Sequence, residues 1–305
     1  MNDPLISYEY SPLVDRKPFS WPNQSKIAVV ITVNLEAWDI VPDPTKPYEG
    51  PSIVQVPIPP GQPNYANYTW REYGHRVGVF RLINVLAKYK VFSSCSLNAA
   101  VGEKFPVTIR EGKKNNWEFL AHSYRQNELL TYYANDPEAE TELINRTLRK
   151  FEEVVGTRAK GWLSPSLSPT RNTLKILAKA GIEFFCDYAN DDQPYILNVQ
   201  EDGGDEIRRV VSIPYSLSLN DYSLFVKDGY TSAEFSQAII DAFDVMCEEQ
   251  DGGGRILNIG LHPHISGQPH LIKGIDNALK YICSERGGVW FPRREQIADW
   301  FLSQV

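Results

Sequence analysis

The sequence predicts an α/β protein that folds as a distorted or incomplete barrel of about seven parallel strands ringed by helices. Short apolar runs rich in β-branched residues alternate with segments of helical period along most of the chain, which is typical of repeated βα units around a parallel sheet. Seven or eight such units are enough to close, or nearly close, a barrel. Because 305 residues with 42% apolar content suit one large core, we expect residues 1–305 to form a single domain.

The predicted strands are the apolar, β-branched runs of the chain, and four of them end abruptly in polar residues. In chain order the predicted strands cover residues 27–36, 91–97, 117–123, 160–164, 182–188, 209–216, 255–262 and 288–291. Helices are predicted to start where a capping residue precedes a segment of helical period. The predicted starts are Asp136-Pro137, Ser168-Pro169 and the capping box of Thr231 and Glu234.

Residues 42–63 form a long segment that is dense in proline and has neither strand nor helix period. Loops of this length without secondary structure are usually functional or disordered. A barrel carries its reactive residues at the carboxyl ends of its strands. We therefore expect this loop to lie over the mouth of the barrel as a lid, or to form an oligomer contact. As a lid, it should be cleaved first in limited proteolysis and be protected by ligand.

Charge and hydropathy exclude several classes of partner. The formal net charge is −7 and no dense block of Lys and Arg occurs, which argues against nucleic acid or an anionic membrane as the main partner. The first residues lack signal-peptide features, and the longest apolar run, 27–33, is too short to span a bilayer. We therefore expect a cytoplasmic protein. The four cysteines are widely separated, which excludes a zinc knuckle or a disulfide scaffold.

The first predicted strand ends in a carboxylate, Glu36, and a second one, Asp39, follows three residues later. A barrel strand delivers its last side chain into the pocket. Glu36 therefore suits a general base or a metal ligand. The alternative is a structural carboxylate that caps the amides of the next loop.

Two of the five histidines, His122 and His262, end predicted strands. Imidazole is the natural proton shuttle near neutral pH and also a common metal ligand. Taken singly, each histidine is about as easily explained by a structural hydrogen bond to a backbone carbonyl. His264 is expected to point away from the pocket because side chains alternate along a strand. His75 and His270 are placed at helix starts and interpreted as structural.

Other motifs supply little further chemistry. No GxSxG elbow, HExxH helix, Walker loop or dinucleotide fingerprint occurs in a suitable context, which excludes the usual serine, zinc-peptidase and nucleotide enzymes. Trp162 lies near a strand end and could wall a pocket, although packing in the core is the simpler interpretation. The polar loop 190–195 contains Asp192 and could position a substrate.

At these residues the sequence resembles the polysaccharide deacetylase superfamily (NodB-like, carbohydrate esterase family 4), and most closely its branch of metal-independent, PuuE-like allantoinases. The resemblance runs over nearly the whole chain, and the order and spacing of the segments make it specific. The resembling segments are 21–22, 27–36, 71–78, 121–125, 161–165, 190–195, 213–216, 220–221, 260–263, 267–269 and 289–291. The resemblance implies a barrel of the NodB-homology type with a single catalytic domain.

The resemblance to the metal-dependent deacetylases would place a catalytic aspartate at Asn34, a metal-binding aspartate at Glu36 and metal-binding histidines at His122 and Gln126. Asn34 cannot act as a base, and Gln126 is a poor substitute for imidazole on zinc. Glu36 and His122 alone do not supply the three protein ligands that a catalytic zinc normally needs. We therefore expect no required cofactor, and at most weak binding of a divalent metal such as zinc.

The resemblance then implies hydrolysis of a carbon–nitrogen bond in a cyclic amide or ureide, such as allantoin or a cyclic imide. We assign Glu36 as the base, His262 as the general acid and His122 as an orienting residue or oxyanion donor. His262→Ala is expected to lower turnover about a hundredfold or more while folding and affinity change little. The residues assigned to substrate binding are Asp39, Tyr73, Arg76, Gln126, Trp162, Asp192 and Asn220.

Two other functions stay open. One is a metal-dependent N-deacetylase of acetylated sugars, and the other is a barrel that binds a small molecule without catalysis. The expected partners are a small-molecule substrate and other copies of the chain, in a tetramer or dimer, because relatives of this branch form tetramers. The sequence does not specify the substrate, because loops set the shape of a pocket.

Overall fold

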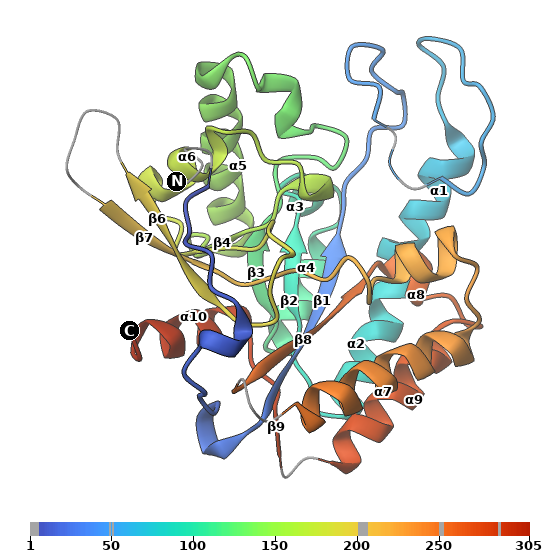
Figure 1. Ribbon diagram of the computed structural model, residues 1–305. Coiled ribbons are helices and arrows are strands. Elements are labelled where there is room, and N and C mark those ends of the chain that lie inside the picture. The colour runs from blue at the N-terminus through green and yellow to red at the C-terminus, as the bar shows by residue number, and fades with distance from the viewer. Residues whose placement is uncertain (1–5, 49, 51, 201–206, 250–252, 286–287) are drawn as a thin grey trace.

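The computed structural model describes residues 6–48, 50, 52–200, 207–249, 253–285 and 288–305. It confirms the predicted fold class, an α/β half-barrel built on a curled and mostly parallel sheet (Figure 1). The strand order is β6-β7-β5-β4-β3-β2-β1-β8, and β9 pairs with β1. Every pair of neighbouring strands is parallel except β6 and β7. Because β6 and β8 lie at opposite ends of this order, the barrel is left incomplete.

All eight predicted strands are present, although several are shorter than the sequence suggests. The strands are β1 (Ile27–Leu35), β2 (Ser94–Leu97), β3 (Glu118–Ala121), β4 (Gly161–Trp162), β5 (Phe184–Phe185), β6 (Tyr195–Gln200), β7 (Ile207–Ser212), β8 (Arg255–Leu261) and β9 (Val289–Trp290). The strand β6 was not predicted; only its first residue, Tyr195, belongs to the polar loop 190–195. It is an edge strand that alternates between buried and more exposed residues, and it pairs antiparallel with β7.

Strand β1 is the centre of the structure. Its nine residues are all buried, as expected for a strand of a parallel sheet that is covered on both faces. It pairs with β8 over seven residues and with β2 at its carboxyl end. The register sets Val33 opposite Leu261, and Leu97 opposite both Leu35 and Ala121. The residues that directly follow β1, β3 and β8 therefore emerge at the same edge of the sheet.

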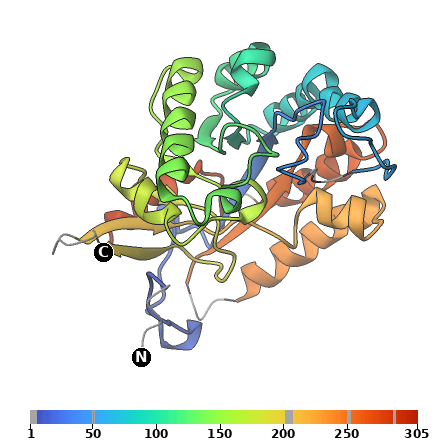
Figure 2. The same cartoon turned by 90° about the horizontal axis from the view of Figure 1, so that it is seen from above.

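Helices surround the outside of the curved sheet (Figure 2). The α-helices are α1 (Tyr65–Tyr73), α2 (Val79–Lys88), α3 (Val101–Lys104), α4 (Pro106–Lys114), α5 (Pro137–Val155), α6 (Thr173–Lys179), α7 (Ser232–Glu248), α8 (Pro263–Ser266), α9 (Ile272–Ser284) and α10 (Arg294–Leu302). The described residues also include two π-helical turns, η3 (Gly74–Gly78) and η6 (Tyr222–Lys227), and four short 3-10 turns. The 3-10 turns are η1 (Leu13–Asp15), η2 (Pro22–Gln24), η4 (Leu130–Tyr133) and η5 (Pro165–Leu167).

Two of the three predicted helix starts are confirmed. Asp136 caps α5 by accepting from the Ala139 amide, and Thr231 and Glu234 form the capping box of α7. The start at Ser168 is wrong, because α6 begins only at Thr173. The Thr173 hydroxyl instead holds the Thr170 amide in a turn before the helix.

The prediction that His75 starts a helix is also wrong. It lies in η3, within a helix that runs through α1, η3 and α2 without a break.

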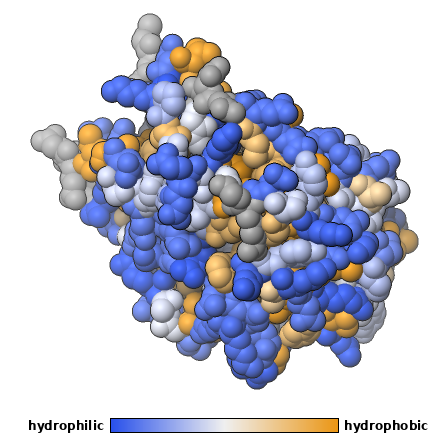
Figure 3. All heavy atoms as spheres, turned by 90° about the horizontal axis from the view of Figure 1, so that it is seen from below, coloured by the Kyte–Doolittle hydropathy of each residue, from blue (hydrophilic) through white to orange (hydrophobic). Residues whose placement is uncertain are grey.

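The described residues of the 42–63 loop contain no helix or strand, while positions 49 and 51 lie outside the described part. No helix in the described residues is long and apolar enough to cross a membrane. Seen from below, the surface is mostly hydrophilic, with apolar residues scattered across it (Figure 3).

Candidate active site

A cavity of about 350 Å³ opens at the carboxyl ends of the strands. This edge of a barrel is where reactive residues are expected. Residues that follow β1, β3, β4 and β8 line it, together with residues from η6 and from the 42–63 loop. Its polar lining includes Asn34, Glu36, Tyr48, His122, Gln126, Ser166, Tyr215, Asn220, Tyr222 and His262.

Glu36 is held on three sides. Its Oε2 accepts a hydrogen bond from the indole Nε1 of Trp38 at 3.1 Å. Its backbone carbonyl lies 2.7 Å from Nε2 of His75, which fixes the chain where β1 ends. Its Oε1 lies 3.4 Å from Nε2 of His262. Glu36 is therefore a buried carboxylate that is paired with a histidine and borders the cavity.

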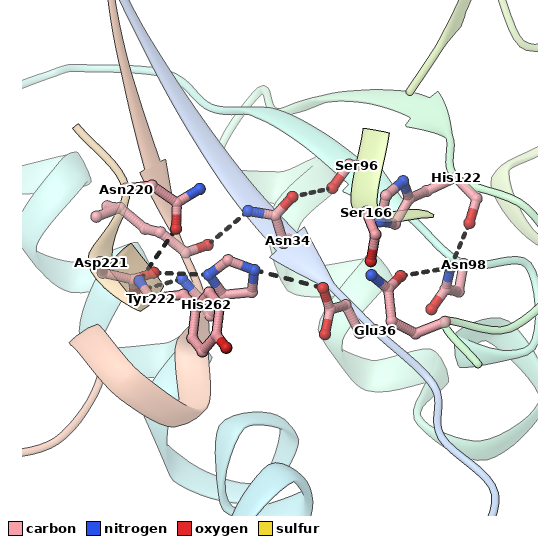
Figure 4. A network of polar contacts seen from close by, with 12 residues as sticks. Asn34, Glu36, Ser96, Asn98, His122, Ser166, Asn220, Asp221, Tyr222 and His262 are labelled. Carbon is pink, nitrogen blue, oxygen red and sulfur yellow. Dashed lines mark hydrogen bonds and ion pairs between the residues drawn. The ribbon is translucent and has the colours of Figure 1, made fainter. Parts of the chain in front are cut away.

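His262 lies between two carboxylates (Figure 4). Its Nδ1 is 2.6 Å from Oδ1 of Asp221, and its Nε2 faces Glu36. Asp221 is completely buried, and its Oδ2 accepts from the His262 amide and from the Ser266 hydroxyl, each at 2.6 Å. Asp221 thus fixes the proton on Nδ1, and it leaves the Nε2 proton of the imidazolium directed at Glu36 and the cavity.

The two charges of this pair hold each other ionised. Burial by itself disfavours the charged form of His262, but the carboxylates of Asp221 and Glu36 outweigh burial and raise its pKa. Burial likewise opposes ionisation of Glu36, and the charge of His262 outweighs it and lowers the pKa of Glu36. Near neutral pH the site therefore contains a carboxylate and an imidazolium in direct contact.

The opposite wall of the cavity is neutral. Nδ1 of His122 donates to the Leu163 carbonyl at 2.6 Å, which fixes the proton on that nitrogen. Burial lowers the pKa of His122, so its Nε2 carries a lone pair near neutral pH. Nε2 then accepts hydrogen bonds. This argues against the predicted oxyanion-donor role, which requires a proton on that atom, and leaves an orienting role. Gln126 lies beside His122, and its Oε1 accepts from Nδ2 of Asn98 at 3.5 Å.

Asn34 lies at the bottom of the site and links neighbouring strands by hydrogen bonds. Its Nδ2 donates to the Tyr215 hydroxyl at 2.9 Å and to the Leu261 carbonyl at 3.2 Å. Its Oδ1 accepts from the Ser96 hydroxyl at 2.5 Å. The Tyr215 hydroxyl also accepts from Nδ2 of Asn220 at 2.9 Å. Asn34 thus ties β1 to β2 and β8, and both polar ends of its side chain are engaged.

The donor atoms of the cavity do not fit a catalytic zinc site. Such a site normally has three His, Cys or carboxylate ligands. Within the described parts of the chain, no group of three or more such residues is arranged to hold a metal ion. The amides of Asn34 and Gln126 stand beside Glu36 and His122 instead. In addition, Oε1 of Glu36 is already paired with His262.

Of the seven predicted substrate-binding residues, Gln126 and Asn220 line the cavity. Arg76 does not, because its side chain is 74% exposed and pairs with Glu72 on the outside of the helix. Tyr73 accepts a hydrogen bond from Arg81, away from the cavity lining. The structure thus places both residues outside the cavity lining, because the helical stretch from α1 to α2 turns their side chains away from the strand ends.

The other three predicted residues also lie outside the cavity lining. Asp39 pairs with Arg125 at 3.3 Å on the loop beyond β1. Trp162 is fully buried, and its indole donates to the Ser164 hydroxyl at 2.9 Å, so it supports the wall without forming it. The Asp192 carbonyl accepts from the Ile256 amide at the start of β8, which is the opposite end of the barrel.

Sequence reasoning missed several residues of the site, among them Asp221 and Tyr48. Asp221 directly precedes η6 and follows no strand, so no strand-end pattern marks it. A signal was available, because a histidine that acts as a general acid generally needs a partner on its second nitrogen. Tyr48 lines the cavity from the proline-dense loop, and nothing in the sequence distinguishes it from other loop tyrosines.

The fold and the site define a class of α/β half-barrel with a buried carboxylate–histidine pair at the carboxyl ends of its strands. The sequence pattern of the family described as "Polysaccharide deacetylase" matches residues 72–185. The chain is 30% identical to a "Putative polysaccharide deacetylase" from Schizosaccharomyces pombe, over 94% of this chain and 92% of that one. The chain belongs to the polysaccharide deacetylase family.

Two solved structures are similar over almost their whole length. A "probable Polysaccharide deacetylase" from Pseudomonas aeruginosa superposes with a TM-score of 0.81 and 26% identity, over 95% of this chain and 96% of that one. The structure of PuuE allantoinase superposes with a TM-score of 0.79 and 25% identity, over 96% and 97% of the two chains. Relatives described both as deacetylases and as an allantoinase therefore share the fold.

Proposed function

We propose that this protein hydrolyses a carbon–nitrogen bond in a small cyclic amide or ureide, and that it does so without a metal ion. One observation carries the proposal: the contact between Glu36 and His262, which Asp221 supports from behind. Hydrolysis of an amide needs a base for water and an acid for the leaving nitrogen. The pair supplies both groups within 3.4 Å of each other.

Glu36 acts as the base in this proposal. A water molecule beside its carboxylate transfers a proton to it while the water oxygen bonds to the ring carbonyl carbon. Trp38 donates to Oε2 of the carboxylate and so fixes its orientation. The bond between the carbonyl carbon and the ring nitrogen then breaks. The products carry a carboxyl group and an amine or urea group at the two ends of the opened ring.

His262 acts as the acid. Its imidazolium gives the Nε2 proton to the departing nitrogen, which would otherwise be a very poor leaving group. Asp221 stabilises the imidazolium and keeps the ring aimed at the cavity. The proton that Glu36 took from water then passes to the neutral His262 across their 3.4 Å contact. This transfer restores the starting pair, so the cycle consumes one water molecule and no external proton donor.

The neutral wall suits an uncharged ring. His122 presents an acceptor on Nε2, which can take a hydrogen bond from a ring N–H. Gln126 and Asn220 offer amide groups that can bind the carbonyl and N–H groups of a ureide. A cavity of about 350 Å³ is at the small end of ligand sites. The similarity to PuuE allantoinase supports the same substrate class.

A second candidate function is removal of an acetyl group from an N-acetylated sugar. Membership of the polysaccharide deacetylase family and the named relatives favour it. The same acid–base pair could serve this reaction, since an acetamide is also cleaved at a carbon–nitrogen bond. The chemistry of the donor set counts against a metal-dependent version, because amides stand at Asn34 and Gln126.

A screen of four substrates distinguishes these functions. Allantoin, hydantoin, succinimide and N-acetylglucosamine are each incubated with purified protein, with and without a chelator. We expect ring opening of at least one cyclic compound at the same rate in both conditions. Release of acetate without any ring opening would establish the deacetylase. If none of the four is hydrolysed while one of them binds, a non-catalytic binding barrel becomes the better description.

A further inference from the structure

The 42–63 loop contributes one aromatic side chain to the cavity, that of Tyr48. The loop reaches the cavity through two contacts near this residue. The Tyr48 amide donates to the Tyr132 hydroxyl at 2.9 Å, and Lys46 pairs with Glu128 at 3.4 Å. Both partners belong to the region around η4, on the far side of the neutral wall. These two contacts therefore hold Tyr48 at the mouth of the cavity.

The 42–63 loop packs against the indole of Trp38. The Tyr48 ring packs against the Trp38 indole with ring centres 5.9 Å apart. Gly50 has a φ of +61°, and a β-carbon added there would clash with the indole ring. Only glycine combines that backbone conformation with so close an approach. The Arg71 guanidinium also packs over the Trp38 indole, 3.7 Å from the ring centre.

The Tyr48 hydroxyl crosses the mouth to Ser166, which donates a hydrogen bond to it. Ser166 and the next residue, Leu167, have φ values of 54° and 51°. Such left-handed conformations are unfavourable for residues other than glycine and cluster at functional sites. This strained turn presents the Ser166 hydroxyl to the loop. The hydrogen bond between Ser166 and Tyr48 thereby joins this turn to the 42–63 loop, at the cavity that Glu36 also lines.

We propose that Tyr48 is a substrate-binding residue that closes the cavity over a small ring and donates a hydrogen bond to it. Because Ser166 donates to the phenol oxygen, the phenol proton is free for a carbonyl oxygen of the ligand. Burial raises the pKa of Tyr48 to about 12, so this proton stays in place. The inference rests on the proposed function, because it specifies a substrate small enough to lie beneath the contact between Tyr48 and Ser166.

The first test separates binding from chemistry. Hydantoin, succinimide and N-acetylglucosamine are titrated calorimetrically into the wild type, Tyr48→Phe and Tyr10→Phe. Tyr10 is 89% exposed and serves as the matched control. Loss of one neutral hydrogen bond should weaken binding by about 2- to 10-fold in Tyr48→Phe. In turnover, KM should rise by the same factor while kcat changes less than about 2-fold. Tyr10→Phe should match the wild type.

The second test needs no ligand. Limited proteolysis within 42–63 should be faster in Tyr48→Phe, Ser166→Ala and Gly50→Ala than in the wild type. The first two changes remove the hydrogen bond between Tyr48 and Ser166, and the third introduces a clash with Trp38. Unchanged affinity for every probe that binds the wild type would overturn the proposal. If the wild type binds none of the three, unchanged cleavage rates would overturn it instead. Weaker binding of N-acetylglucosamine alone would keep Tyr48 as a ligand residue and reject the cyclic substrate.

Discussion

The two walls of the cavity follow strands of the same sheet, yet they differ in charge. On one wall Glu36 and His262 form an ion pair 3.4 Å apart, with Asp221 behind the imidazole. On the other wall His122 is kept neutral by burial and gives its Nδ1 proton to a backbone carbonyl, beside the amide of Gln126. Both histidines end a strand and both are buried. Only His262 contacts carboxylates directly, and their charges and hydrogen bonds outweigh burial and reverse the direction of its pKa shift.

This difference teaches that a histidine at a strand end has no fixed role. Two carboxylates make His262 a protonated acid, whereas a carbonyl and burial make His122 an acceptor. In the proposed mechanism, charge is concentrated on the wall that moves protons, and the neutral groups face the part of the substrate that does not react.

The largest effect is expected from Glu36→Gln. This change keeps the size of the side chain and removes the base, so kcat should fall by about 100- to 10,000-fold. Affinity for substrate should change much less, because the amide can still accept from Trp38. Steady-state kinetics on the substrate found in the screen measures both quantities. A rate within a few-fold of the wild type would show that the charged wall does not act as the base.

The second effect, about 100-fold in kcat, is expected from His262→Gln, which removes the acid. The structure corrects the expectation that loss of His262 leaves stability unchanged. Without the imidazolium, two buried carboxylates lose their partner, and breaking a buried pair costs about 3–5 kcal/mol. Chemical denaturation and kinetics should therefore both show a loss. His264→Ala, which removes a ring packed on Trp70 outside the cavity lining, should keep most of the turnover.

A third effect is expected in the dependence of stability on pH. The pKa of His262 is raised above its ordinary value of 6.5, so its stabilisation is complete below pH 6.5 and is lost as the pH rises through the folded-state pKa. The pKa of Glu36 is lowered below 4.5, so its contribution is complete above pH 4.5 and is lost on acidification. The wild type should therefore lose stability above pH 6.5 more steeply than His262→Gln. Parallel melting curves of the two proteins across this range would contradict the pairing.

Much of the fold was predictable because the apolar runs are distinct. The nine buried residues of β1 and the seven of β8 form mostly apolar runs, and the parallel direction of the strands follows from their alternation with helices. The three candidate catalytic residues, Glu36, His122 and His262, could be brought to one cavity for the same reason. Each follows a strand, and the carboxyl ends of parallel strands meet at one edge.

The remaining parts of the site depend on contacts between segments far apart in the sequence. Asp221 lies 41 residues before His262, and their hydrogen bond exists only after η6 has packed beside β8. Tyr48 reaches the cavity through contacts with Tyr132 and Ser166. Arg76 was assigned to the pocket, but the rotation of its helix, which is set by tertiary packing, leaves its side chain 74% exposed. Local pattern contains none of this information.

The smallest effect on activity, and the sharpest on metal binding, is expected from Gln126→His. The change adds an imidazole beside Glu36 and His122. The cavity would then present three side chains of the kinds that bind zinc. We expect the zinc content of the purified variant to rise well above that of the wild type, while hydrolysis without added metal changes only a few-fold. Elemental analysis of both proteins measures the zinc. Equal and low zinc in both would mean that the charged wall already excludes a metal from this position.

The central claim is that the pair of Glu36 and His262 hydrolyses a ring carbon–nitrogen bond without a metal. The most direct measurement is the initial rate of ring opening by protein that has been treated with a chelator, compared with the same protein reloaded with zinc. The account predicts substoichiometric zinc in the treated protein, an undiminished rate and no gain on reloading. A rate that disappears with chelation and returns with stoichiometric zinc bound by Glu36 and His122 would contradict it.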